Sequence, residues 1–148
     1  MKRKIETQIV INAPAETVYR LLTQLDNYKN WNPFIIESKG KAVVGQRLVN
    51  VMRNGNGSIR FQPIVTRAEE NTAFEWLGSL GIRGLFDGRH YFVIERIKDN
   101  QVNLIHGEYF SGVLSGWLLR KIDEQTRSNF IAMNQALRAE AERLVARS

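Results

Sequence analysis

The chain has 148 residues, of which 43% are hydrophobic and 24% are charged, and it contains no cysteine. This length favours one domain spanning 1–148, large enough to bury about 70% of the surface of the unfolded chain. The lack of cysteine excludes disulfides and thiolate chemistry and is compatible with a cytoplasmic protein. No apolar stretch approaches the roughly 20 residues that cross a bilayer, and the basic N-terminus is not followed by the apolar segment of a secretory signal.

The net charge of +6 arises from 21 Lys and Arg against 15 Asp and Glu. Clustered positive charge would indicate nucleic acid or an anionic membrane as a partner. Here the basic residues are interspersed with acidic ones, except at 2–4 and 120–121. The aromatic residues lie on separate apolar faces rather than among the basic residues. We therefore expect a solvated surface and no nucleic-acid partner.

The N-terminal part is expected to form one strand followed by one or two short helices. Apolar and polar residues alternate over 4–12, and Ile5, Thr7, Ile9 and Ile11 share one face, which predicts a strand. Asn12-Ala13-Pro14-Ala15-Glu16 then predicts a helix start, because proline is favoured in the first turn and an acidic residue stabilises this end. A last short turn is expected before Pro33, where the helical conformation is disfavoured.

After Pro33 the pattern predicts six further strands, which gives seven in total. They are expected over residues 34–44, 46–53, 58–68, 72–78, 90–98 and 101–110. Asn54-Gly55-Asn56-Gly57 supplies the positive φ angles that a tight hairpin needs. A long amphipathic helix is expected from Ser115 to about Ala146, because apolar residues recur at every third or fourth position, with Thr126 as a polar gap. Strands flanked by helices predict the α+β class with an antiparallel sheet.

Five segments, taken in this order, resemble the START-like helix-grip superfamily, also called SRPBCC, in its polyketide cyclase/dehydrase and lipid-transport branch. They are Ile11-Asn12-Ala13-Pro14-Ala15-Glu16-Thr17-Val18-Tyr19, Trp31-Asn32-Pro33-Phe34, Glu75-Trp76-Leu77-Gly78, Gly88-Arg89-His90-Tyr91-Phe92 and His106-Gly107-Glu108-Tyr109-Phe110-Ser111-Gly112. The resemblance implies a seven-stranded antiparallel sheet curved around the C-terminal helix, with an apolar cavity between them. It implies no shared set of catalytic residues, so the fold alone does not decide the function.

Trp76 and His90 are expected to lie side by side. If the strands 72–78 and 90–98 pair around Arg83, Trp76 faces His90, and Phe74 faces Phe92 in the same way. This cluster is either one wall of a pocket with a single polar group or a core pair with a hydrogen-bonded histidine.

His106 and Glu108 share a strand face with Leu104 and Phe110, and this face should point inward. Burying both polar groups is costly unless they are hydrogen-bonded, so we expect them to pair with each other and to shift each other's pKa. Whether His90 joins them depends on the turn at Asp99-Asn100. A two-residue turn puts His90 on the opposite face, whereas a longer turn or a bulge puts it on the same face.

These three polar residues have several alternative roles. As general acid/base groups they would serve a cyclase, dehydratase or hydrolase. As orienting groups they would hydrogen-bond the polar end of a ligand. As metal ligands His106, Glu108 and His90 would form a triad of two histidines and one carboxylate, but the resemblance implies no metal, and we expect no cofactor. A structural role remains the fourth alternative.

The favoured function is the binding or carriage of a hydrophobic small molecule, such as a lipid, quinone or polyketide, by a protein that is not an enzyme. The alternative is a cyclase/dehydratase-like enzyme that uses His90, His106 and Glu108 as acid/base groups. Asn134 is expected to offer one amide contact to the ligand. The residues expected to bind the ligand are Trp76, His90, Phe92, His106, Glu108 and Phe110 on the sheet, and Phe130, Met133 and Leu137 on the helix.

The segment 78–88 is rich in glycine but lacks the Gly-Lys-Ser/Thr ending of a phosphate-binding loop. Its apolar residues are unusual for a solvated loop. Three interpretations remain open: a lid at the mouth of the cavity, a tip that makes transient membrane contact, or a wide hairpin packed on the domain. The residues that would touch a membrane are Leu80, Ile82, Leu85 and Phe86.

Overall fold

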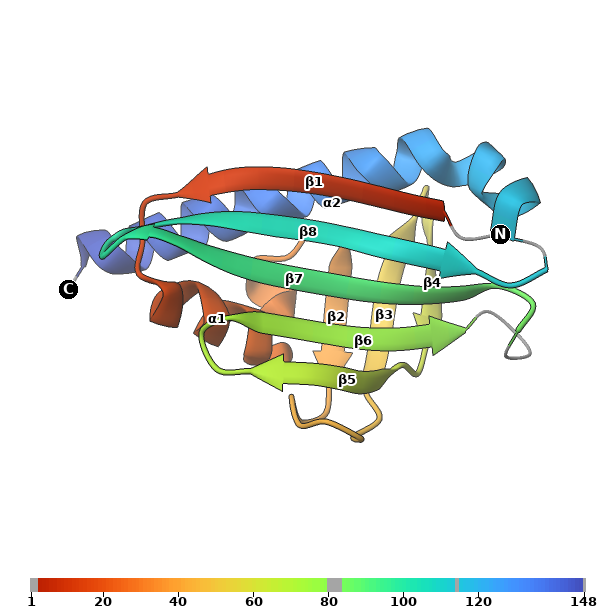
Figure 1. Ribbon diagram of the computed structural model, residues 1–148, viewed down its shortest axis with the longest axis horizontal. Helices are drawn as coiled ribbons and strands as arrows, with labels where there is room; N and C mark the ends of the chain where they lie inside the picture. Colours follow the sequence, from red (N-terminus) through yellow and green to blue (C-terminus); the bar gives the residue numbers. More distant parts are fainter. Residues whose placement is uncertain (1–2, 80–83, 114, 148) are drawn as a thin grey trace.

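Two antiparallel sheets and one long helix form the framework of the computed structural model, which describes residues 3–79, 84–113 and 115–147 (Figure 1). The larger sheet has the strand order β1-β8-β7-β6-β5. Its strands are β1 (Arg3–Ile11), β5 (Ile64–Glu69), β6 (Ala73–Ser79), β7 (Asp87–Lys98) and β8 (Gln101–Ser111). The smaller sheet, of order β2-β3-β4, consists of β2 (Ile35–Lys39), β3 (Val49–Asn54) and β4 (Gly57–Phe61).

Helical segments follow the first and the last strand. The helix α1 (Ala15–Thr23) and the short 3-10 helix η1 (Leu25–Asn30) follow β1, and α2 (Ser115–Ala146) follows β8. Helix α2 packs against β1, β8 and α1, and it runs along the large sheet on the side of β1 (Figure 1). This arrangement confirms the expected α+β helix-grip architecture. None of the described helices combines the length and apolar character needed to cross a membrane.

The expected strand 58–68 is divided at Pro63, so the part of the chain that the structure describes has eight strands in two sheets. Proline has no N–H to donate to a neighbouring strand, and it therefore interrupts the ladder. Strand β4 ends in the small sheet before Pro63, and β5 begins after it in the large sheet. The Leu48 N–H donates to the carbonyl oxygen of Pro63 (2.8 Å), which holds this corner against the segment before β3.

The pairing of β6 with β7 has the predicted register. Trp76 lies opposite His90, and Phe74 lies opposite Phe92. Because side chains alternate between the two faces of a strand, this register places both aromatic pairs on the inner face of the sheet. All four residues are buried.

The β7–β8 hairpin decides the open question about His90. The strands are joined by the two-residue turn Asp99-Asn100, but the register shifts by one residue between Arg96 and Lys98. Beyond this bulge His90 pairs directly with Glu108. Without the shift, His90 would lie opposite the next residue of β8, whose side chain points outward. The bulge therefore brings His90 to the inner face.

The hydrophobic core lies between the large sheet, α1 and one stripe of α2. Phe130, Met133 and Leu137 are fully buried, as their helical spacing predicts. They belong to one cluster with residues from the sheet and from α1, among them Phe74, Phe92, Leu104, Val18, Leu21 and Leu22.

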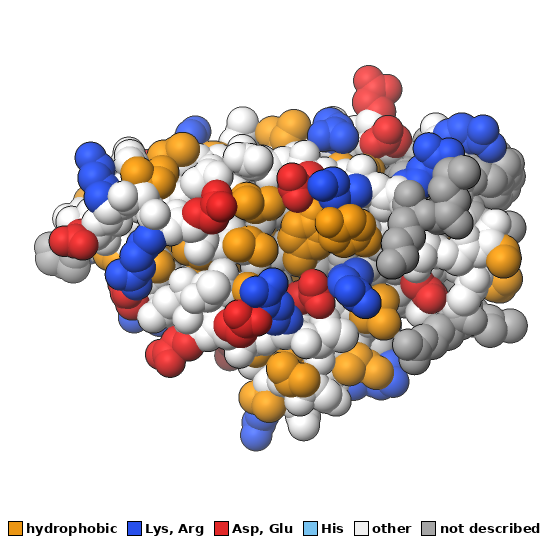
Figure 2. Space-filling view, viewed as in Figure 1, with side chains coloured by type: hydrophobic (Ala, Val, Ile, Leu, Met, Phe, Trp, Pro, Cys, Tyr) orange, Lys and Arg blue, Asp and Glu red, His pale blue; other side chains and the backbone are white. Residues whose placement is uncertain are grey.

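The face of the molecule shown in Figure 2 carries basic and acidic side chains side by side. Ion pairs also join neighbouring elements of the protein, such as Arg96 with Glu16 at 2.5 Å and Arg89 with Glu75 at 4.0 Å. On this face the excess of positive charge is therefore dispersed rather than gathered into one patch.

Tyr28 links η1 to the end of α1. Its side chain is fully buried, and its hydroxyl donates a hydrogen bond of 2.5 Å to the carbonyl oxygen of Leu22. The last carbonyls of a helix have no partner within the helix, so this bond satisfies a group that would otherwise be buried without one. Burial raises the pKa of Tyr28, so the hydroxyl keeps the proton that it donates.

Replacing Tyr28 by phenylalanine is expected to lower the free energy of unfolding by about 1–3 kcal/mol, because the Leu22 carbonyl loses its partner. Urea denaturation followed by circular dichroism measures this change. The matched control is Tyr109→Phe, at a side chain that is 42% exposed, where a change below about 0.5 kcal/mol is expected. Equal effects of the two substitutions would contradict this role of Tyr28.

Candidate functional site

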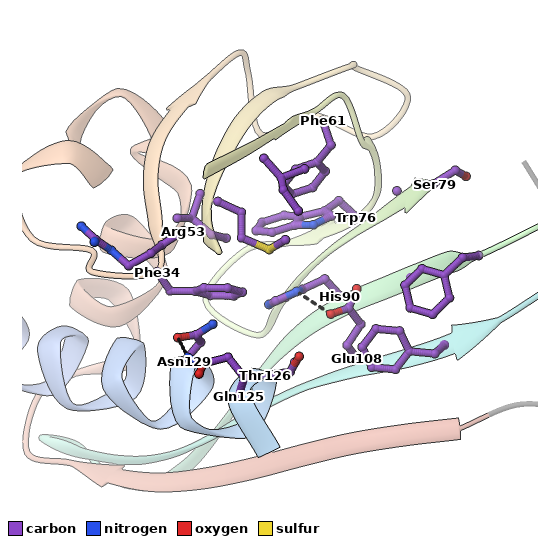
Figure 3. Close-up of a pocket in the computed structure, with 17 residues that line it drawn as sticks. Phe34, Arg53, Phe61, Trp76, Ser79, His90, Glu108, Gln125, Thr126 and Asn129 are labelled. Carbon is purple, nitrogen blue, oxygen red and sulfur yellow. Dashed lines mark hydrogen bonds and ion pairs between the residues drawn. The ribbon is translucent and has the colours of Figure 1, made fainter. Parts of the chain in front are cut away.

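A cavity of about 220 Å³ lies between the large sheet, the small sheet and the N-terminal half of α2 (Figure 3). Most of its wall is apolar. The side of the small sheet contributes Phe34, Ile35, Met52, Arg53, Ile59 and Phe61. The large sheet and the segment before β7 contribute Trp76, Gly78, Ser79, Phe86, Gly88, His90, Glu108 and Phe110, and α2 contributes Gln125, Thr126 and Asn129.

The position of the cavity follows from the apolar pattern of α2. From Phe130 onward the helix places large apolar side chains against the sheet, and these fill the interior. About one turn before Phe130 the apolar repeat is interrupted at Thr126. Thr126 and its neighbours Gln125 and Asn129 face the cavity. The helix therefore packs tightly against one half of the sheet and leaves space over the other half.

Aromatic rings form much of the cavity wall. The Trp76 ring stacks on the His90 imidazole with 4.8 Å between the ring centroids, and Phe86 stacks on Phe110 at 5.5 Å. Phe34, directly before β2, approaches His90 with a centroid distance of 6.4 Å (Figure 3). Flat apolar rings with a few polar groups among them are typical of small-molecule sites.

His90 and Glu108 form the polar end of this wall. They pair across β7 and β8, and Glu108 Oε1 lies 3.5 Å from His90 Nδ1 (Figure 3). Gly88 makes room for the carboxylate, since a Cβ at this position would overlap with Glu108 Oε2. His90 is buried, whereas Glu108 is partly exposed. The strand pairing therefore places one imidazole and one carboxylate at the edge of an apolar space.

A chain of buried hydrogen bonds continues behind His90. Its Nε2 is 2.8 Å from Nε2 of His106, and Nδ1 of His106 is 2.7 Å from Oδ1 of Asn134 on α2. Asn134 Nδ2 donates to the Thr7 hydroxyl on β1 at 2.8 Å, and this hydroxyl donates to the backbone carbonyl of His106 at 2.9 Å. All four residues are buried, so the hydrogen bonds offset the cost of removing these groups from water.

His106 is held in its neutral form. Burial lowers its pKa well below the ordinary value of 6.5, and the neighbouring His90 lowers it further, whereas the hydrogen bond with Asn134 acts in the opposite direction. The His106 ring lies flat against Phe130, with 4.3 Å between the centroids. It is therefore part of the core, one layer behind the cavity wall.

A sequence model of the family described as polyketide cyclase / dehydrase and lipid transport matches residues 2–148. The chain belongs to this family. No curated protein matches the sequence.

Several solved structures share the fold. The Zhui aromatase/cyclase from Streptomyces sp. R1128 is 15% identical over 98% of this chain and 96% of its own, with a TM-score of 0.77. A START superfamily protein from Mycobacterium smegmatis is 18% identical over 95% of this chain and 98% of its own, with a TM-score of 0.73. The di-domain aromatase/cyclase BexL is 15% identical over 91% of this chain, which spans only 46% of BexL, with a TM-score of 0.73. At these identities the likeness shows the fold alone.

The nine residues expected to bind a ligand divide into two groups. Trp76, His90, Glu108 and Phe110 line the cavity. The other five are buried in the layer behind it, because the apolar half of α2 packs directly against the sheet there. They are Phe92, His106, Phe130, Met133 and Leu137.

The expected pairing of His106 with Glu108 is wrong. Both side chains point to the inner face of β8, but the His90 side chain, from the neighbouring strand β7, lies between them and contacts both. Asn134 is also placed differently, because its amide bonds to His106 and Thr7. Among the described residues no group of three or more potential metal ligands converges.

The sequence analysis did not identify Thr7, Phe34 or Phe61 as part of the site or of its support. Thr7 carried a signal, since it is a polar residue between Ile5 and Ile9 on the apolar face of β1. In the segment 78–88, Phe86 is buried against Phe110 rather than exposed as a membrane tip, and Leu85 is 37% exposed. Leu80 and Ile82 lie outside the described residues.

Because the folded state keeps His106 neutral, the free energy of unfolding should decrease as the pH falls below the ordinary pKa of histidine. Above the ordinary value of 6.5 the residue is neutral in both the folded and the unfolded state. Below it only the unfolded chain takes up this proton, so unfolding becomes easier by up to about 1.4 kcal/mol per pH unit. Urea titrations over this range are expected to show a smaller loss of stability on acidification for His106→Gln than for the wild type.

The control for this measurement is Leu137→Ala, which removes buried volume at about 2–5 kcal/mol but leaves His106 in place. It should keep the wild-type dependence on pH. If His106→Gln and the wild type lose stability equally on acidification, His106 is not the group that titrates.

Proposed function

We propose that this protein binds one compact hydrophobic molecule in the cavity between the sheet and α2, and that it acts as a binding or carrier protein. The observation that carries the proposal is the aromatic cavity itself. The three described residues of α2 that line it, Gln125, Thr126 and Asn129, are polar, whereas the helix from Phe130 onward packs into the core. Gly88 leaves room in the wall for the Glu108 carboxylate. Protein interiors are otherwise closely packed, so a concave, mostly apolar space with a few polar groups is a candidate ligand site.

The size of the cavity narrows the class of ligand. An apolar cavity of about 150 Å³ accommodates a single benzene ring, and sites for drug-sized molecules begin near 300 Å³. At about 220 Å³, this cavity suits one or two fused rings. A long acyl chain would extend beyond it.

A second candidate function is acid/base catalysis on such a molecule. His90 and Glu108 are the specific observation in its favour, because an imidazole and a carboxylate face the same apolar space. The family description includes cyclases and dehydrases, and Zhui is an aromatase/cyclase. Catalysis would require that His90→Phe abolishes turnover of a substrate while its binding persists, whereas a carrier loses only affinity or orientation.

The proposed function is tested by filling the cavity from the helix side. Thr126→Phe should weaken binding of naphthalene at least about tenfold, because the new ring occupies the space of the ligand. The matched control is Gln135→Phe on the exposed side of the same helix, which should bind naphthalene as the wild type does. Equilibrium dialysis or ligand-observed NMR measures both. Wild-type protein that binds no naphthalene, or equal binding by both variants, would overturn the proposal.

A further inference from the structure

The hydrogen bonds behind the cavity wall determine which nitrogen of His90 carries a proton. The reasoning starts at Thr7, whose hydroxyl lies 2.9 Å from the backbone carbonyl of His106. A carbonyl oxygen only accepts, so Thr7 donates its single proton there. The Thr7 oxygen must then accept from the Asn134 amide at 2.8 Å, which orients the amide with Nδ2 toward β1.

This orientation turns the Asn134 carbonyl toward His106. Oδ1 of Asn134 lies 2.7 Å from Nδ1 of His106, so Nδ1 carries the proton of this ring. Since the buried His106 is neutral, its Nε2 has no proton and can only accept. The neighbouring Nε2 of His90, at 2.8 Å, must therefore donate.

In its neutral form, with the Nε2 proton committed to His106, His90 presents an unprotonated Nδ1 to the cavity. The Glu108 carboxylate, which also accepts hydrogen bonds, lies 3.5 Å from this nitrogen. No lysine or arginine within the described residues forms an ion pair with Glu108. Arg53, which also lines the cavity, is exposed, and its Nε donates to the Pro33 carbonyl at 3.3 Å. In the described part of the chain, two acceptors thus converge at one end of the cavity, and no cationic side chain pairs with them.

We propose that His90 Nδ1 and the Glu108 carboxylate form an acceptor subsite for a single hydrogen-bond donor on the ligand. Thr7, Asn134 and His106 are positioning residues that hold His90 in the accepting state. The subsite deepens the proposed function and rests on it. The ligand class it selects is a compact, flat, apolar molecule with one hydroxyl or N–H group, because a carboxylate or an isolated carbonyl at this end would face two acceptors and gain no hydrogen bond.

The positioning role is tested by the tautomers of the two histidines. Long-range ¹H–¹⁵N spectra at about pH 8, above the usual titration range of histidine, distinguish Nδ1–H from Nε2–H. We expect the Nδ1–H form for His106 and the Nε2–H form for His90 in the wild type. His90 in the Nδ1–H form, or His106 in the Nε2–H form, would overturn the assignment without any substitution.

A substitution then tests whether Asn134 is responsible. Asn134→Leu removes the acceptor for His106 Nδ1, and both rings are expected to lose their single tautomer. The matched control is Gln135→Leu, at the next and exposed helix position, which should leave the wild-type spectrum unchanged. Unchanged tautomers in folded Asn134→Leu protein would show that Asn134 does not position the pair.

The acceptor subsite is tested with three ligands of similar size: naphthalene, 2-naphthol and 2-methoxynaphthalene. We expect 2-naphthol to bind at least about tenfold more tightly than 2-methoxynaphthalene, since only 2-naphthol can donate. His90→Phe should remove this preference while naphthalene still binds, and Glu108→Gln should reduce it.

The outcomes separate the two proposals. If none of the three ligands binds, the proposed function fails. If all three bind with equal affinity, the cavity is a binding site but the acceptor subsite is wrong. A preference for 2-naphthol that persists in both His90→Phe and Glu108→Gln would also overturn the subsite, because the donor would then have another partner.

Discussion

The β7–β8 hairpin contains one extra residue, between Arg96 and Lys98, and the whole inner face of the sheet depends on it. With a two-residue turn alone, the inward-facing residues of the two strands would not be opposite one another. The bulge shifts the register by one, so that His90 pairs with Glu108 and Phe92 with His106. The same shift therefore creates both the polar end of the cavity and the histidine pair behind it.

The interface between α2 and the sheet serves two purposes along its length. Where the helix presents Phe130, Met133 and Leu137, the interior is closed and holds the fold together. Where it presents shorter polar side chains around Thr126, the interior opens into the cavity. His106 lies at the boundary between these halves. Its ring packs on Phe130 as a core residue would, while its two nitrogens connect Asn134 to His90.

Much of this framework follows from the sequence. The range 115–146 of the last helix and the inward face of β8 depend only on periodicity, because a side chain's face is set by its position along a regular element. The register of Trp76 with His90 needed one further assumption, that the two strands pair around Arg83. The division at Pro63 also has a local cause, although the strand over 58–68 was expected to continue through it. The fold class was predictable because these local preferences agree with one another.

The site was less predictable, because its polar contacts join residues far apart in the chain. A one-residue bulge has no distinct sequence pattern, so the pairing of His90 with Glu108 could be stated only as an alternative. Thr7 and Asn134 are 127 positions apart, and only the tertiary packing of β1 against α2 brings them together. The expectation that His106 would pair with Glu108 failed for the same reason, since it considered one strand without its neighbour.

A crystal structure of the protein in complex with 2-naphthol tests the central claim most directly. The account predicts electron density for the naphthalene rings between Trp76 and the polar side chains of α2, with the hydroxyl oxygen at about 3 Å from His90 Nδ1 or from a Glu108 carboxylate oxygen. Rings that lie outside the cavity, or a hydroxyl that points away from both acceptors toward the solvent, would contradict it.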